Sequence, residues 1–335
     1  MIFIDLASTT LSQQEMALLT HPFVSGIVLF KRNIDSTDQL AELISHIKVI
    51  NPKLSIAIDQ EGGIVQRLRE GVAAIPAMRS FGKIYDESPQ TAIERIAECA
   101  WLVGSELSAL GIDINFAPVV DVDAGISTII GDRAFHSDPN VIVTLCQTYI
   151  DVMMSTGVMP VLKHFPGHGH VRLDSHIDQP VDTRDIDAVW ECDVLPYREL
   201  HYPAVMMSHV IFSEADTMPA GFSTYWVKTL LREQLRFSGI IFSDALDMSA
   251  AAVVGDMEDR VLAALKAGCN IVLVCNHGEA RQALLASLGS HPQMKENYRP
   301  FFIPVQNKTE TMSLSSLQQT TAYKEIRARI EGILS

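Results

Sequence analysis

Side chains that can move protons or bind metal ions are concentrated in one short stretch of this chain of 335 residues. The stretch KHFPGHGHVRLDSH runs from Lys163 to His176. It holds four of the 11 histidines, namely His164, His168, His170 and His176. Imidazole titrates near neutral pH and is also a common metal ligand. The stretch is therefore a catalytic loop, a metal site or a polar surface loop, and its place in the fold decides between these.

The end of the stretch favours proton transfer. Asp174 and His176 are two residues apart, close enough for the carboxylate to contact the imidazole if the loop turns there. A carboxylate partner fixes the histidine tautomer and raises its basicity, which gives a general acid/base that works near neutral pH. Gly167 and Gly169 suit an irregular backbone that can close over a ligand.

A metal site is the alternative for the middle of the stretch. His168 and His170 are spaced like the H-x-H pair of barrel metallohydrolases. Sites of that kind draw ligands from several strand ends, and here only His164 and His209 are further histidine candidates. The pair also follows the apolar run at 158–164 rather than the first run. We therefore expect no catalytic metal, and we interpret His168 and His170 as loop histidines.

Other polar residues follow apolar runs along the whole chain. They are Lys31-Arg32-Asn33, Asp59-Gln60-Glu61, Asp121, Asp123, Asp132-Arg133, Lys163-His164, His209, Asp244 and Asn276. Polar loops are ordinary, but charged groups placed directly after buried strands are costly unless they are used. The set as a whole therefore indicates one ligand-binding rim.

The elements that must position these residues show a regular alternation. Eight short apolar runs recur, at 2–6, 26–30, 54–59, 112–120, 158–164, 204–210, 239–245 and 270–276. Such Val/Ile/Leu-rich runs fit parallel strands buried on both faces. Segments with helical period lie between them, at 36–50, 88–111, 224–235 and 257–268, and a last helix is expected around 320–334. The pattern predicts an α/β fold, a (β/α)8 TIM-type barrel in a single domain over 1–335, with the tail from about 279 packing outside. A doubly wound open sheet is the alternative.

Composition limits the classes of partner. The formal charge is 26 − 40 = −14, which argues against binding nucleic acid or an anionic membrane through bulk electrostatics. Five cysteines without C-x-x-C spacing indicate reduced thiols in a cytoplasmic protein. The start MIFIDLAST does not read as a signal peptide, and no apolar segment approaches a membrane span. We expect a monomer that acts on a small molecule.

Several motifs together resemble glycoside hydrolase family 3. They are KHFPGHG with DSH at 163–176, IDQEGGIVQR at 58–67, NFAPVVD at 115–121, GDRAF at 131–135 and FSDALDM at 242–248. The chain is most similar to the short, single-domain bacterial members, which are β-N-acetylglucosaminidases of peptidoglycan recycling. The similarity runs in the same order from about residue 2 to residue 277.

The resemblance implies a role for particular residues. Asp244 would be the nucleophile that forms a covalent glycosyl-enzyme, and His176 the general acid/base oriented by Asp174. The residues that hold the terminal N-acetylglucosamine would be Asp59, Arg67, Arg133, Lys163 and His164. No metal or other cofactor is implied. The substrate would be a carbohydrate, N-acetylglucosaminyl-1,6-anhydro-N-acetylmuramic acid with or without peptide.

Two positions depart from the family pattern, and some alternatives stay open. Ile64 stands where the family usually has arginine, and Ala245 follows Asp244 where a second acid is common, with Asp247 as the next carboxylate. Asp244 could instead cap a helix, Asp174 could cap its loop, and Arg67 and Arg133 could form surface salt bridges. For function, the alternatives are a phosphorylase on the same fold, a metal-dependent amidohydrolase and a non-catalytic sugar sensor.

Overall fold

Nine parallel strands form the centre of the computed structural model, which describes residues 1–172, 179–278, 280–291, 294 and 312–334. The strands are β1 (Ile2–Asp5), β2 (Val24–Leu29), β3 (Ser55–Ile58), β6 (Ile114–Asn115), β7 (Met159–Pro160), β8 (Leu162–Phe165), β10 (Ala204–Met207), β12 (Ile240–Ala245) and β13 (Ile271–Val274). Each of the eight apolar runs supplies strand residues, so the predicted strand set is confirmed.

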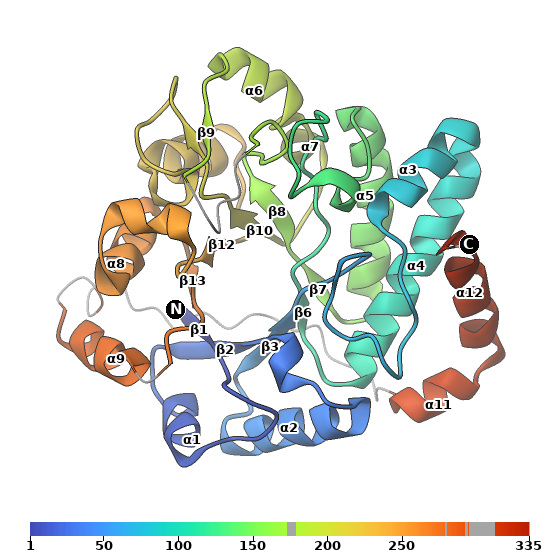
Figure 1. Ribbon diagram of the computed structural model, residues 1–335, viewed down its shortest axis with the longest axis horizontal. Coiled ribbons are helices and arrows are strands. Elements are labelled where there is room, and N and C mark those ends of the chain that lie inside the picture. The colour runs from blue at the N-terminus through green and yellow to red at the C-terminus, as the bar shows by residue number, and fades with distance from the viewer. Residues whose placement is uncertain (173–178, 279, 292–293, 295–311, 335) are drawn as a thin grey trace.

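The sheet curls into a barrel because its two ends belong to one stretch of chain. The order is β7-β6-β3-β2-β1-β13-β12-β10-β8, and only Val161 separates β7 from β8. β7 and β8 together therefore occupy the place of a single strand that closes a nearly complete eight-membered ring (Figure 1). The predicted (β/α)8 barrel is confirmed, and the open doubly wound sheet is excluded.

Two of the runs differ most from the single continuous strands that the sequence indicated. The run at 112–120 gives only β6, and the run at 158–164 is divided into β7 and β8. Pro118 and Pro160 lie in these runs, and proline cannot donate to a strand ladder. Pairing resumes past Pro118, where Val119 bridges Lys163 and the Val120 N–H donates to the Lys163 carbonyl at 2.9 Å.

Helices surround the barrel (Figure 1). They are α1 (Gln13–Leu19), α2 (Thr37–Ile50), α3 (Met78–Glu87), α4 (Pro89–Ala109), α5 (Pro139–Ser155), α6 (Ile186–Cys192), α7 (Leu195–Glu199), α8 (Met257–Ala267), α9 (Ala280–Ser290), α11 (Leu314–Gln319) and α12 (Thr321–Glu331). Tyr225–Gln234 is also helical, as predicted, but it is wound as a π-helix, with the Leu235 N–H bonded to the Leu230 carbonyl at 2.9 Å. Short 3₁₀ turns lie at Lys31–Asn33, Gly131–Arg133, Ala220–Phe222, Ser249–Val254 and Gly332–Leu334.

Apolar side chains fill both faces of the sheet. One cluster packs inside the barrel and includes Phe3, Phe116 and Phe242, whose rings meet edge to face at centroid distances of 5.6 Å. A larger cluster lies between the strands and the helices. The barrel is thus a packed scaffold rather than a pore, and its strand ends are rigid supports for a site.

The C-terminal helices pack beside α4, at the right of Figure 1. The Tyr323 hydroxyl of α12 donates to the buried Glu106 carboxylate of α4 at 2.6 Å, and Glu106 also accepts from the Ala73 N–H at 2.8 Å. None of the helices in the described ranges is both long and apolar enough to cross a membrane.

Candidate active site

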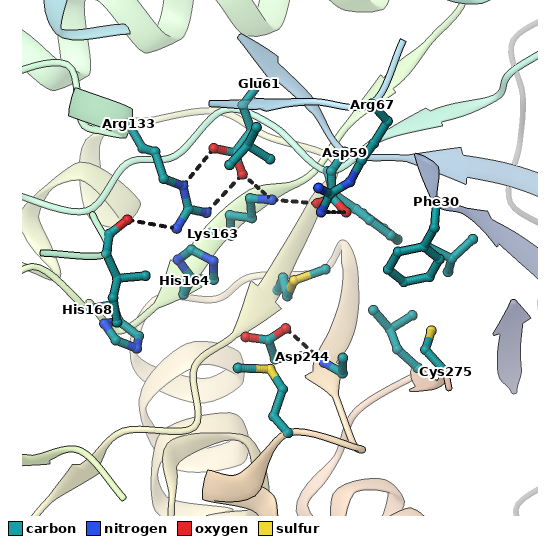
Figure 2. A pocket seen from close by; sticks show the side chains of 18 of the residues that line it. Phe30, Asp59, Glu61, Arg67, Arg133, Lys163, His164, His168, Asp244 and Cys275 are labelled. Carbon is teal, nitrogen blue, oxygen red and sulfur yellow. Dashed lines mark hydrogen bonds and ion pairs between the residues drawn. The ribbon is translucent and has the colours of Figure 1, made fainter. Parts of the chain in front are cut away.

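A cavity opens at the carboxyl ends of the strands (Figure 2), where barrel enzymes place their sites. It holds about 820 Å³ of empty space including its solvent-filled mouth, enough for a monosaccharide. Its charged lining residues are Asp59, Glu61, Arg67, Arg133, Lys163 and Asp244, with His164 and His168 beside them. Six of the eight site residues predicted from the sequence are thus brought together in one pocket.

The other two predicted residues, Asp174 and His176, lie outside the described residues. Their assignment as an acid/base pair therefore stays a prediction. The described part of the same loop reaches from β8 to Arg172 and supplies His168 to the pocket lining.

Four side chains form a buried ionic chain along one wall of the pocket (Figure 2). Lys163 Nζ lies 2.8 Å from Asp59 Oδ1 and 2.6 Å from Glu61 Oε1. Glu61 also accepts two hydrogen bonds from Arg133, from Nε at 2.8 Å and from Nη2 at 2.9 Å. This bidentate geometry fixes the plane of the guanidinium. The prediction that Arg133 could be a surface salt bridge is wrong, because its partner Glu61 is only 3% exposed.

The ionic chain keeps Glu61 and Lys163 charged. Burial would raise the pKa of Glu61, but Arg133 and Lys163 outweigh it and hold that pKa well below its usual range. Burial would lower the pKa of Lys163, but Asp59 and Glu61 raise it above the ordinary value. Glu61 and Lys163 therefore do not change protonation state near neutral pH, and they suit binding rather than acid/base work.

Arg67 reaches the pocket from a short hairpin formed by β4 (Gln60–Gly62) and β5 (Val65–Gln66). Gly62 and Gly63 make the turn with φ values of +110° and +55°, which other residues rarely adopt. The Arg67 Nη2 lies 3.4 Å from Asp59 Oδ2, a long contact that leaves the guanidinium available to a ligand. Ile64 sits at the hairpin tip, 80% exposed and away from the pocket lining.

His164 is held by a carboxylate that the sequence did not single out as its partner. Its Nδ1 lies 2.7 Å from Asp121 Oδ2, and its backbone N–H donates to Asp121 Oδ1 at 3.1 Å. The His168 N–H donates to the same oxygen at 2.9 Å. Burial would raise the pKa of Asp121, but the charge and hydrogen bonds of His164 bring it below its usual value. Asp121 thus orients the His164 ring and pins the start of the loop.

Asp244 enters the pocket from β12, on the side away from Glu61 and Arg133 (Figure 2). Ala245 still belongs to β12, and the next helical turn begins only at Ser249, so Asp244 does not cap a helix. Asp247, the other nearby carboxylate, bonds the Asn276 amide at 2.8 Å and is not part of the lining. Of these two carboxylates, Asp244 is therefore the one that lines the pocket.

Three of the histidines that were candidate metal ligands, His164, His168 and His209, do not form a metal site in the described part of the chain. His209 stacks on Phe222 and bonds the Ala245 carbonyl through Nε2 at 3.1 Å, so it supports the strand end beside Asp244. Burial lowers the pKa of His209 and that of His168, which favours neutral rings. Within the ranges that the structure describes, His164, His168 and His209 belong to no cluster with metal-ligand geometry.

Fold and site together define a TIM-barrel enzyme with a fixed-charge pocket for a polar small molecule. Comparison with known proteins gives the family. Residues 3–296 match the glycosyl hydrolase family 3 N-terminal domain. The chain therefore belongs to glycoside hydrolase family 3, and within it the chain is a β-hexosaminidase.

Individual relatives agree with this assignment. A β-hexosaminidase of Methylobacillus flagellatus is 46% identical over 291 residues, which cover 86% of this chain and 83% of the relative. One from Alkalilimnicola ehrlichii is 41% identical over 335 residues, covering 99% and 95%. Among solved structures, NagZ from Neisseria gonorrhoeae in complex with N-trifluoroacetyl-D-glucosamine superimposes with a TM-score of 0.88 at 34% identity, covering 100% of this chain and 98% of that one.

Proposed function

We propose that this β-hexosaminidase is a retaining exo-β-N-acetylglucosaminidase that removes terminal N-acetylglucosamine from peptidoglycan fragments. The observation that carries the proposal is the charge balance of the pocket. Its lining has three carboxylates and three cations, a net charge of 3 − 3 = 0 in a chain of net charge −14. Fixed charges of both signs make strong hydrogen bonds to the hydroxyls of a neutral sugar without attracting an ion.

The wall opposite Asp244 is suited to hold the sugar hydroxyls. Asp59 can accept from hydroxyl groups, while Arg67, Arg133 and Lys163 can donate to their oxygens. His164, oriented by Asp121, presents its second nitrogen toward the same space. The relative that binds an N-acylated glucosamine analogue supports N-acetylglucosamine as the occupant.

Asp244 is the nucleophile in this scheme. Its carboxylate attacks the anomeric carbon while the bond to the leaving oxygen breaks, and His176 gives that oxygen its proton. Water then attacks the same carbon and gives a proton to His176, while the bond between that carbon and Asp244 breaks. The pairing of His176 with Asp174 rests on the family motif. Placement of Asp244 on a strand end supports its role, because in-line attack needs a rigid group.

The natural substrate we propose is N-acetylglucosaminyl-1,6-anhydro-N-acetylmuramic acid, with or without its peptide, cleaved in the cytoplasm by a monomeric enzyme. This follows from the resemblance to short family members of peptidoglycan recycling. Comparing kcat/KM on that disaccharide with kcat/KM on chitobiose tests it. A preference for chitobiose would contradict the assignment.

The nucleophile is tested with a matched pair of variants. An activated fluorosugar should attach to Asp244, identified by peptide mass. Asp244→Asn should lower turnover of 4-nitrophenyl N-acetyl-β-D-glucosaminide by about 10²–10⁴ or more. Asp247→Asn, three residues away and outside the lining, should stay near the parent rate. Label on Asp247, or equal loss in both variants, would overturn the assignment. Turnover should also survive EDTA, and phosphate buffer should yield no sugar 1-phosphate.

A further inference from the structure

A second cluster of reactive side chains lies beside the pocket but outside its lining. It joins His170, in the loop after β8, to Cys192 and Asp193 at the end of α6. One ligand atom of each residue lies within 4.8 Å of the others. His170 Nδ1 and Asp193 Oδ1 are 3.1 Å apart. Such spacing is close to the separation of two ligands around one tetrahedral ion.

We propose that His170, Cys192 and Asp193 bind one zinc ion, or another divalent cation of similar softness. The three donors are an imidazole nitrogen, a thiolate sulfur and a carboxylate oxygen, the ligand types that zinc takes in proteins. Hard cations such as Mg²⁺ prefer oxygen alone and should not compete. With three protein ligands, the fourth position is left for water.

The charges around the cluster fit a divalent ion. Arg184 is the cation already present, with Nη2 at 2.6 Å from Asp182 Oδ2 and 2.8 Å from Asp193 Oδ2. The two aspartates and Arg184 sum to −1, and metal binding ionises Cys192, which brings the sum to −2. One divalent ion then makes the group neutral.

Arg184 does not contact the ligand oxygen of Asp193, although it also hydrogen-bonds the Cys192 side chain, where its charge favours the thiolate. It contacts Oδ2 of Asp193, whereas Oδ1 faces His170. A ligating carboxylate whose second oxygen is held by a cation is a common outer-shell arrangement. Asp193 is therefore oriented before the ion arrives, and its side chain is only 1% exposed.

The ion has a route to the cluster, because His170 and Cys192 are half-buried while Asp193 is buried. Binding would tie the loop after β8 to α6. Gly167 already passes so close to Asp193 that a Cβ there would lie 2.6 Å from Oδ1, which shows how tightly this loop packs on the helix end. The chain continues from His170 to Asp174 and His176, so the ion would fix one end of the segment that carries the proposed acid/base pair. It takes no part in bond cleavage.

The test uses the full chain, freed of metal by a chelator and then dialysed. One equivalent of Co²⁺ should produce thiolate-to-cobalt charge-transfer absorption in the near ultraviolet. Zn²⁺ should displace it and should slow the reaction of native protein with Ellman's reagent, since Cys192 is half-buried and the other four cysteines are buried. Mg²⁺ should do neither.

Variants decide whether the ion sits at this cluster. Cys192→Ser should abolish the charge-transfer band, and His170→Ala should weaken Zn²⁺ binding by more than about 100-fold. Both should fold, as neither side chain is fully buried, and His201→Ala, an exposed histidine outside the cluster, should bind like the parent. Absence of stoichiometric binding, or equal Zn²⁺ affinity in Cys192→Ser, would overturn the proposal. These readouts need no turnover, so they are independent of the proposed reaction.

Discussion

Replacing Glu61 with glutamine should weaken sugar binding in a barrel that still folds. Glu61 touches Arg133 twice and Lys163 once, and it is buried under both. The substitution keeps size and shape but removes the negative charge. Lys163 retains Asp59 at 2.8 Å, whereas Arg133 loses the carboxylate that accepts both of its hydrogen bonds, because glutamine offers one acceptor oxygen and a donor NH2 in its place. Arg133 should therefore move away from the position in which it can bind the sugar.

The expected magnitude follows from the contacts. A hydrogen bond to a charged group contributes about 1.5–3 kcal/mol. Losing one such bond from Arg133 to the sugar would lower kcat/KM by about 10- to 150-fold. Breaking a buried ionic group costs about 3–5 kcal/mol of stability. Because the pKa of Glu61 is depressed, its stabilising effect is present at neutral pH and is lost as the pH falls below about 4.3.

The assay is kcat/KM with 4-nitrophenyl N-acetyl-β-D-glucosaminide, alongside urea unfolding at neutral and acidic pH. Glu98→Gln is the matched control. Glu98 also bridges two arginines, Arg95 and Arg329, but it lies between α4 and α12 on the outside of the barrel. Its variant should keep the parent kcat/KM. The reasoning is refuted if Glu61→Gln retains kcat/KM within about twofold, or if both variants lose activity equally.

Three further changes have definite expected outcomes. Asp121→Asn removes the charge that orients His164, so kcat/KM should fall by about 10- to 150-fold. Thermal unfolding of the variant should remain a single cooperative transition, which would show that it still folds. Gly169→Ala would place a Cβ 1.8 Å from the Val122 carbonyl oxygen, so it should cost about 1–3 kcal/mol in urea unfolding, whereas Gly289→Ala, with open space around it, should not. Burial raises the pKa of Glu106 to about 7, so its favourable contribution is complete below about pH 4.3 and is lost as the pH rises through about 7. Glu106→Gln should therefore flatten the fall in melting temperature between about pH 5 and about pH 8, and an unchanged pH dependence would contradict this.

The strands could be predicted because burial on both faces leaves a strong signal in the sequence. Each of the eight apolar runs has too few polar residues for a surface strand, and each is a parallel strand in the barrel. The exact strand limits could not be predicted. Pro118 and Pro160 interrupt the ladders locally, yet the chain stays extended, because neighbouring carbonyls and N–H groups still pair across the gap.

The pocket could be placed from the sequence, since parallel strands end on one edge of a barrel. Which side chains turn inward was harder to predict. Glu61 was noted only as a strand-end acid, although Asp59 and Glu61 are two residues apart and so point to the same side of an extended chain. That spacing explains why both reach Lys163. The same signal, applied to the DQE stretch, would have assigned Glu61 to the ionic chain.

The histidines of the 163–176 stretch show why residue type alone does not define a role. His164 is bonded to Asp121 from the loop after β6, while His170 is bonded to Asp193 at the end of α6. His168 donates its backbone N–H to Asp121, and the residue lines the pocket. Each carboxylate comes from a distant part of the chain, so spacing within the stretch could not reveal these pairs. The result is a loop pinned at two places, one on the pocket side and one on the helix side. Both anchors lie in the part of the loop that precedes Asp174 and His176 in the sequence, and neither could be read from the spacing of the histidines.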